Sequence, residues 1–137
     1  MPGRMNHWLT DRFASMVESA LTLPLLVLVT LAFVNFALAG YASVTANNAV
    51  NYASRMGSVE QVNPAGTAYA AANQALRAGV GDYTVTVEQA DPQSGGRVAV
   101  RVNWSVPNFF AGLMPLFGAQ ASPLQGEAVS VFRKEGW

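Results

Sequence analysis

The longest apolar run of the chain lies near its N-terminus. Residues 19–41 read SALTLPLLVLVTLAFVNFALAGY, and no charged residue occurs between Glu18 and Arg55. At about 1.5 Å per residue this run would form a helix of about 35 Å, and a bilayer core requires about 20 such residues. The pattern therefore predicts one transmembrane helix over residues 19–41.

Two other interpretations of this run stay open from the sequence. A globular protein can bury an apolar helix on all sides, although a domain as small as this one has little room to do so. A cleaved secretory signal is the second alternative, and Ala37, Ala39 and Gly40 could form its cleavage site. The apolar part of such a signal is normally shorter than this run.

The helical pattern continues beyond the apolar run, over residues 42–62. Small residues recur there at alternating spacings of four and three, so they would form a narrow stripe along one helix face. The stripe consists of Ala42, Ala46, Ala49, Ala53 and Met56, and the residues predicted to lie away from it are Ser43, Asn47, Asn51 and Ser54. Because small side chains permit close backbone approach, we expect another helix, from this chain or from a partner, to pack there.

A second helix is predicted by the signals at its two ends. Asn63 is a suitable N-cap, Pro64 suits the first helical position, and Gly79 suits the stop. Arg77 would fall in the last turn, where a positive charge is favoured. The apolar face of this helix would consist of Ala65, Tyr69, Ala72 and Leu76.

The period of the apolar residues then changes to two, which is typical of strands with one buried face. In residues 82–89 the inward set would be Tyr83, Val85 and Val87, with Thr84, Thr86 and Glu88 opposite. In residues 96–106 it would be Val98, Val100, Val102, Trp104 and Val106, with Arg97, Ala99, Arg101, Asn103 and Ser105 opposite. The turn-rich sequence DPQSGG between them predicts an antiparallel hairpin. A third strand is expected roughly from Leu124 to Arg133, because three strands against a helix can form an independent core.

The predicted fold class is therefore α+β, with a long N-terminal transmembrane helix followed by a small helix and a three-stranded antiparallel sheet. Its segments would be a tail (1–18), the membrane helix (19–41), a helix extension (42–62) and a small domain (63–137). Within that domain, residues 107–118 read PNFFAGLMPLFG, an apolar segment broken by Pro115 and two glycines. We interpret it as a loop folded over the sheet edge, and the alternative is a contact patch for a membrane or a partner.

Charge and chemistry exclude several functions. The formal net charge is +0 from 8 basic and 8 acidic residues, which argues against nucleic-acid binding and a polybasic lipid-binding tail. Cysteine is absent and His7 is the one histidine, so thiolate sites, histidine triads and histidine metal clusters are excluded. The glycines form no phosphate loop, and the acids beyond the apolar run show no paired spacing. The sequence thus predicts no enzyme, no cofactor, no metal and no small-molecule substrate.

Two residues of the apolar run and its border stand out. Glu18 directly precedes the apolar run. Its carboxylate could face the lipid headgroups at the helix N-terminus or form an ion pair with a cation on a neighbouring protein. Pro24 lies six residues later and removes the backbone hydrogen bond to the carbonyl of Ala20. Arg4 and Arg12 precede the run, so the positive-inside rule places the N-terminus in the cytoplasm and the C-terminal domain outside the cell membrane.

The stretch SMVESALTLPLLVLVTLAFVNFALAGY resembles the N-terminal region of TadE-like proteins, which are pseudopilin-like components of tight-adherence pilus systems. The resemblance is carried by Val17-Glu18, by the Ala20-Leu21 pair, by Pro24 and by the apolar run. It implies a pilin-like fold and a structural role, with Glu18 pairing with a positive group near the start of another helix. It departs at Phe13, where the family's processing pattern would place a glycine for cleavage by a prepilin peptidase.

The function expected from this resemblance is that of a minor pseudopilin or assembly protein, and the alternative is an accessory single-pass subunit of a larger membrane complex such as a respiratory or photosynthetic assembly. The expected partners are membrane lipid and other membrane protein subunits. The residues expected to make the assembly contacts are Glu18, Pro24, Ala42, Ala46, Ala49 and Ala53.

Overall fold

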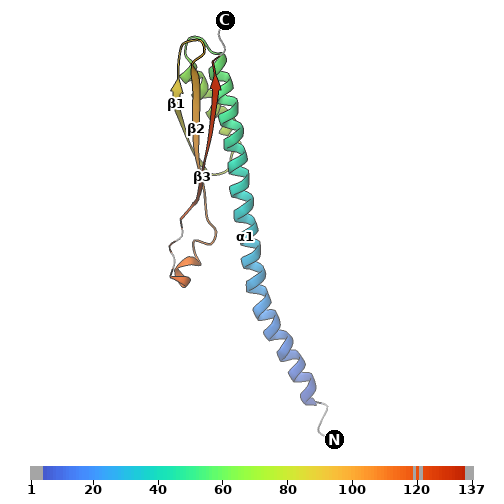
Figure 1. Ribbon diagram of the computed structural model, residues 1–137. Helices are drawn as coiled ribbons and strands as arrows, with labels where there is room; N and C mark the ends of the chain where they lie inside the picture. The colour runs from blue at the N-terminus through green and yellow to red at the C-terminus, as the bar shows by residue number, and fades with distance from the viewer. Residues whose placement is uncertain (1–4, 119, 121, 135–137) are drawn as a thin grey trace. The chain divides into compact units, whose positions relative to one another are not determined.

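The computed structural model describes the backbone of residues 5–118, 120 and 122–134. The elements, shown in Figure 1, are helix α1 (Met5–Val59), helix α2 (Pro64–Leu76), strands β1 (Asp82–Ala90) and β2 (Arg97–Val106), the short 3₁₀ helix η1 (Met114–Phe117) and strand β3 (Leu124–Arg133). This is the predicted α+β, pilin-like arrangement. The chain divides into two compact units, of which the first ends at Val34 and the second begins at Asn35.

The apolar part of α1 from Met16 to Thr30 lies in the first unit. Every side chain from Met16 to Thr30 is exposed. The hydroxyl of Thr22 donates to the Glu18 carbonyl at 2.7 Å, and that of Thr30 donates to the Leu26 carbonyl at 2.8 Å. Because these hydroxyls bond within the helix itself, they add little to the cost of placing it in lipid.

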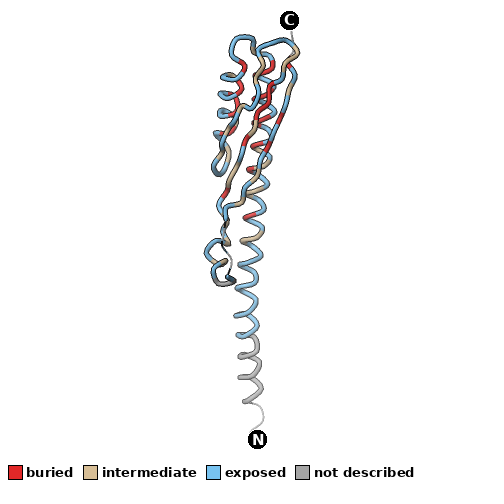
Figure 2. The backbone as a smooth tube through the Cα atoms, turned by 60° about the vertical axis from the view of Figure 1, so that its left-hand side comes forward, coloured by how far each residue is buried: buried red, intermediate tan, exposed pale blue. Residues whose placement is uncertain are grey.

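The part of α1 in the second unit contributes to a core with α2 and the sheet. Figure 2 shows the buried residues of this unit gathered where these elements meet. The core is built largely from alanine and valine, with the members Ala46, Ala49, Val50, Ala53, Ala68, Ala71, Ala72, Leu76, Val98, Val100, Val102 and Ala128. Small residues allow the helices and the sheet to approach closely: a Cβ placed on Gly57 would lie 2.9 Å from Val98 Cγ1 and 3.0 Å from Ala68 Cβ.

For two residues of α1, the burial differs from what the predicted stripe implied. Ser54 was expected away from the alanine stripe but is fully buried. Its hydroxyl donates to the Val50 carbonyl at 2.6 Å and accepts from the hydroxyl of Ser130 on β3 at 3.0 Å. Met56 was expected on the stripe but is 37% exposed. The buried face is wider on one side than the stripe because α1 packs against both α2 and the sheet.

Helix α2 begins as predicted, since the side-chain oxygen of Asn63 accepts from the Gly66 amide at 2.9 Å. The helix ends at Leu76, so Arg77 is the C-cap and lies just beyond the last turn rather than in it. Its buried face also differs from the prediction: Ala68 and Ala71 are buried, whereas Tyr69 is 52% exposed. Ala65, also expected on the buried face, is exposed. The alanines permit close approach to the neighbouring elements, and the larger tyrosine lies at the rim.

The three strands pair antiparallel in the order β1-β2-β3, which confirms the predicted hairpin and third strand. Val87 pairs with Val100, which pairs in turn with Ser130, and the predicted alternation holds along both strands of the hairpin with one exception. Ala99 was expected on the open face but is 6% exposed, because its small side chain lies between Gln89 and Val131 on the neighbouring strands.

The segment 107–118 does not fold over the sheet edge as expected. It continues past the end of β2, forms turns and η1, and lies beyond the end of the sheet (Figure 1). Hydrogen bonds to Asn35 and Asn108 fix this position, as described below.

Candidate functional site

The exposed surface of α1 between Met16 and Val34 is predominantly apolar. Its large exposed hydrophobic residues in the first unit are Met16, Val17, Leu21, Leu23, Leu25, Leu26, Val27, Leu28, Val29, Phe33 and Val34. The most apolar window of the helix has a mean hydropathy of 2.3, and 6% of that window is buried. Large apolar surfaces of this extent are found where a protein meets lipid or another protein. In the part of the chain that the structure describes, α1 alone is long and apolar enough to cross a membrane.

This exposure decides against one interpretation of the apolar run. A helix in the core of a globular protein would be mostly buried, and α1 from Met16 to Thr30 is not. The helix therefore fits a single membrane span, which is what the sequence predicted.

The expected site residues do not form one cluster. Glu18 and Pro24 are exposed and belong to the first unit, and the helix continues on both sides of Pro24. The side chain of Arg12 and the whole of Arg4 lie outside the described residues.

The four alanines of the stripe lie inside the second unit, where each of Ala42, Ala46, Ala49 and Ala53 is 0% exposed. Their own chain covers them, and Ala46, Ala49 and Ala53 belong to one core with residues of α2 and the sheet. An assembly contact at these alanines would require that packing to open.

An asparagine inside the apolar run makes contacts that sequence reasoning missed. Asn35 is 6% exposed, and its side-chain nitrogen donates to the side-chain oxygen of Asn108 at 3.0 Å. Its side-chain oxygen accepts from the Phe109 amide at 3.0 Å. Asn108 in turn donates to the Ser122 carbonyl at 3.2 Å and accepts from the Phe110 amide at 3.0 Å. These two asparagines form a polar clip that fastens segment 107–118 to α1.

Asn35→Ala should release this segment without unfolding the domain. The Phe109 amide would lose its acceptor, and an unsatisfied buried polar group costs about 1–3 kcal/mol. Hydrogen exchange of residues 109–111, followed by mass spectrometry on the full chain in detergent, should therefore become faster. The matched control is Asn47→Ala, because Asn47 is exposed on the same helix and donates to the Ser43 carbonyl of that helix at 2.8 Å. Equal exchange in both variants would show that the clip does not hold the segment.

Aromatic residues lie close to the end of the apolar run. The hydroxyl of Tyr41 donates to the Ala78 carbonyl at 3.1 Å, and that of Tyr83 donates to the Val80 carbonyl at 3.1 Å. Burial raises the pKa of Tyr83. Tyr83 also pairs across the sheet with Trp104, whose ring occupies the space that a Cβ on Gly126 would need. Tyrosine and tryptophan are enriched at membrane–water interfaces, so their position agrees with a span that ends near Tyr41.

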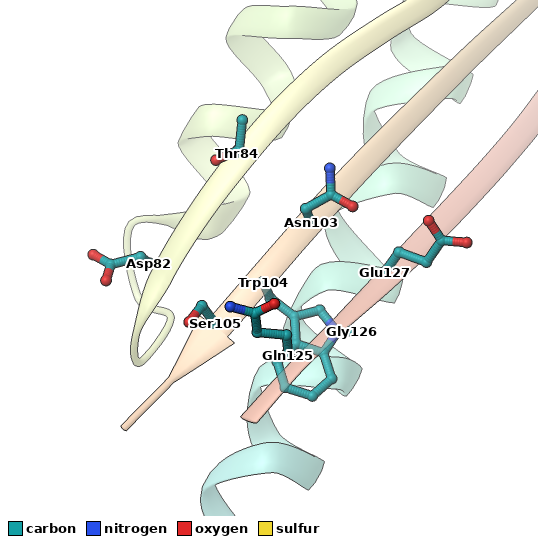
Figure 3. A pocket seen from close by; sticks show the side chains of 8 residues that line it. All are labelled: Asp82, Thr84, Asn103, Trp104, Ser105, Gln125, Gly126 and Glu127. Atoms are coloured by element: carbon teal, nitrogen blue, oxygen red, sulfur yellow. The ribbon is translucent and has the colours of Figure 1, made fainter. Parts of the chain in front are cut away.

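The open face of the sheet carries charge and a polar hollow. Arg101 on β2 donates to Glu88 at 2.5 Å and also to Glu127, and these hydrogen bonds raise the pKa of Arg101. The hollow is shown in Figure 3, and its lining residues are Asp82, Thr84, Asn103, Trp104, Ser105, Gln125, Gly126 and Glu127. One of its two carboxylates is thus already paired with Arg101. No group of three or more potential metal-ligating side chains occurs among the described residues.

The part of the chain that matches a known family includes the exposed apolar residues of α1 and the alanine stripe. Residues 14–55 match the TadE-like protein family. The matched TadE-like segment contains Glu18, Pro24, Asn35 and the four alanines, and it confirms the resemblance inferred from the sequence. No curated protein and no solved structure matches the chain.

Proposed function

We propose that this chain is a membrane-anchored structural protein that acts as a minor pseudopilin in a tight-adherence pilus or secretion system. The observation that carries the proposal is the TadE-like segment itself, in which one helix has an exposed apolar part and a part packed into the domain core. Residues 19–41 cross the cell membrane, the tail before them lies in the cytoplasm, and the domain formed by residues 42–137 lies on the outer side of the membrane. The excess of arginine before the span supports this orientation.

The structure offers two surfaces for contact with other subunits of such an assembly. The apolar side chains of the span from Ser19 to Thr30 are exposed, and so is Glu18 at its border. In the second unit, an exposed ridge along α1 contains Tyr52, Met56 and Val59, which line an open hollow together with Asn51 and Arg55. Assembly contacts therefore use the exposed faces of α1, while the alanine stripe holds the domain to the helix.

Glu18 supplies specificity to the contact within the membrane. A carboxylate at a helix centre costs about 2.5–3.5 kcal/mol on insertion scales, and the cost falls toward the interface. Glu18 lies at the border of the apolar run, so the chain can insert without a partner for this group. A cation near the start of a neighbouring helix would offset the remaining cost and set the register between subunits.

Glu18→Gln should leave membrane insertion and folding intact but lower the yield of the assembled complex severalfold. The complex is isolated from native membranes with the tagged full chain, and carbonate-resistant protein in the same membranes measures insertion. Glu60→Gln is the matched control, because Glu60 follows the end of α1 in the second unit. Loss of carbonate-resistant protein would show that Glu18 acts in insertion instead, and an unchanged yield would remove its role in assembly.

The same isolation identifies the assembly. Co-isolation with a secretion ATPase and pilins supports the pseudopilin proposal. Co-isolation with a respiratory or photosynthetic complex would contradict it and would favour an accessory subunit.

A further inference from the structure

We propose that segment 107–118, named here the apolar loop, is a second membrane contact that rests in the outer boundary of the bilayer beside α1. The inference rests on the proposed single span of α1. It assigns a lipid surface as the partner of a part of the domain that lies far along the sequence from the TadE-like segment.

The position of the apolar loop along α1 is the first argument. The loop is bonded to Asn35 through Asn108 and Phe109. Asn35 lies six residues before Tyr41, the end of the predicted span, which corresponds to about 9 Å along the helix axis. A span of about 35 Å centred on a hydrocarbon core of about 30 Å extends about 2–3 Å beyond the core at each end. Asn35 then lies about 6 Å inside the outer surface of the core, so a segment clipped to Asn35 reaches the outer part of the acyl-chain region.

The composition of the loop and its surroundings is the second argument. No charged residue occurs between Arg101 and Glu127. Phe109 is 48% exposed, and Phe110, Leu113 and Met114 are partly exposed. Along β2 the residues therefore change in order from the charged Arg101 to Trp104 and then to the apolar loop. The same order of charge, interfacial aromatic residue and apolar residue is found along segments that enter a bilayer.

The backbone of the loop is the third argument. Irregular backbone enters lipid at a high cost unless its polar groups are bonded within the protein. Six amides of this loop have acceptors in the chain: Phe109 donates to Asn35, Phe110 to Asn108, Ala111 to Asn108, Leu113 to Phe110, Met114 to Phe110 and Gly118 to Pro115. In lipid, where no water is available, Asn35 and Asn108 accept hydrogen bonds from the Phe109 and Phe110 amides.

The absence of cysteine from the chain allows a direct measurement of depth. Single cysteines replace Ala111 in the loop, Gln93 in the β1–β2 connection and Val27 in the span, all three of which are exposed residues. Each full-length variant is labelled with a nitroxide and reconstituted into phosphatidylethanolamine–phosphatidylglycerol vesicles at a low and a high ratio of protein to lipid. Collision of the nitroxide with oxygen, which concentrates in lipid, is compared with collision with a water-soluble nickel chelate.

The expected ratio of oxygen to nickel accessibility is severalfold higher at Ala111→Cys than at Gln93→Cys, and it approaches the ratio at Val27→Cys. A water-like ratio at Ala111→Cys together with a lipid-like ratio at Val27→Cys would overturn the inference and leave the span intact. A water-like ratio at Val27→Cys would overturn the span, and the inference with it. Protection of Ala111→Cys from both reagents at the high protein ratio alone would show that a second copy of the chain covers the loop, which also contradicts a lipid contact.

Discussion

Val100→Asp is expected to abolish stable folding of the second unit. Val100 is 0% exposed at the middle of the central strand, and it lies among the core residues contributed by both helices. An isolated carboxylate at such a site has no partner, so its burial costs several kcal/mol even after relaxation. Since a domain of this size is stable by about 5–15 kcal/mol, that cost is a large part of the total. Denaturation of the full chain in lipid nanodiscs, followed by near-ultraviolet circular dichroism, measures the loss.

Val131→Asp is the matched control, because it introduces the same carboxylate into the neighbouring strand. Val131 is 54% exposed on the open face of the sheet, where water can solvate the new charge. Its effect should stay within about 0.5 kcal/mol, as for most surface substitutions. Comparable damage from the two variants would mean that the open face is covered as well, which would indicate a partner lying on the sheet.

Gly81→Ala should also destabilise the second unit strongly. Gly81 has a φ of 101°, a region that residues with a Cβ occupy at a cost of about 1–3 kcal/mol. A Cβ at this position would overlap the carbonyl oxygen of Ser105 and lie 2.7 Å from Val106 Cγ1. Because the oxygen belongs to the backbone of the central strand, relief would require β1 and β2 to separate at this end. The expected total is about 3 kcal/mol or more, measured by the same denaturation.

Gly118→Ala separates these two costs. Gly118 has a φ of 69°, and a Cβ placed there would meet nothing within 4 Å. This variant should therefore show the conformational cost alone, about 1 kcal/mol. If both variants lose the same stability, the contact with Ser105 contributes nothing and the prediction for Gly81 is wrong in its cause.

The elements with a strong local pattern could be predicted from the sequence. The period of two predicted the hairpin, and the Asn63-Pro64 pair predicted the start of α2. The third strand has a less regular pattern and was expected because a lone hairpin forms no independent core. Such patterns depend on residues within a few positions of each other, so no knowledge of the rest of the chain is needed. The periodicity of apolar residues says less about burial at the edge of the apolar face of a helix or strand. Ser54 and Ala99 are buried because of neighbours on other elements, and a period along one element does not report on those neighbours.

In the candidate site, too, the residues marked by a local pattern could be predicted, and those defined by contacts with distant parts of the chain could not. Glu18 and Pro24 could be selected because a charge and a proline are unusual beside an apolar run, and the family match includes both. Asn35 was not selected, because its partner Asn108 lies 73 residues further along the chain. A lone asparagine in a membrane segment was the available signal, since such polar groups seek internal partners in lipid.

The alanine stripe of α1 has a mechanical consequence. Within the second unit, α1 supplies Ala46, Ala49, Val50 and Ala53 to the core, so this part of the helix is held along its length by packed contacts. A pull on α1 along its axis would act directly on this packed face. The domain would then be loaded in shear along its alanine contacts, and many contacts along α1 would have to slide together before it yields. The second unit should therefore resist a pull along α1 more strongly than a pull that peels the helix away from the core one contact at a time.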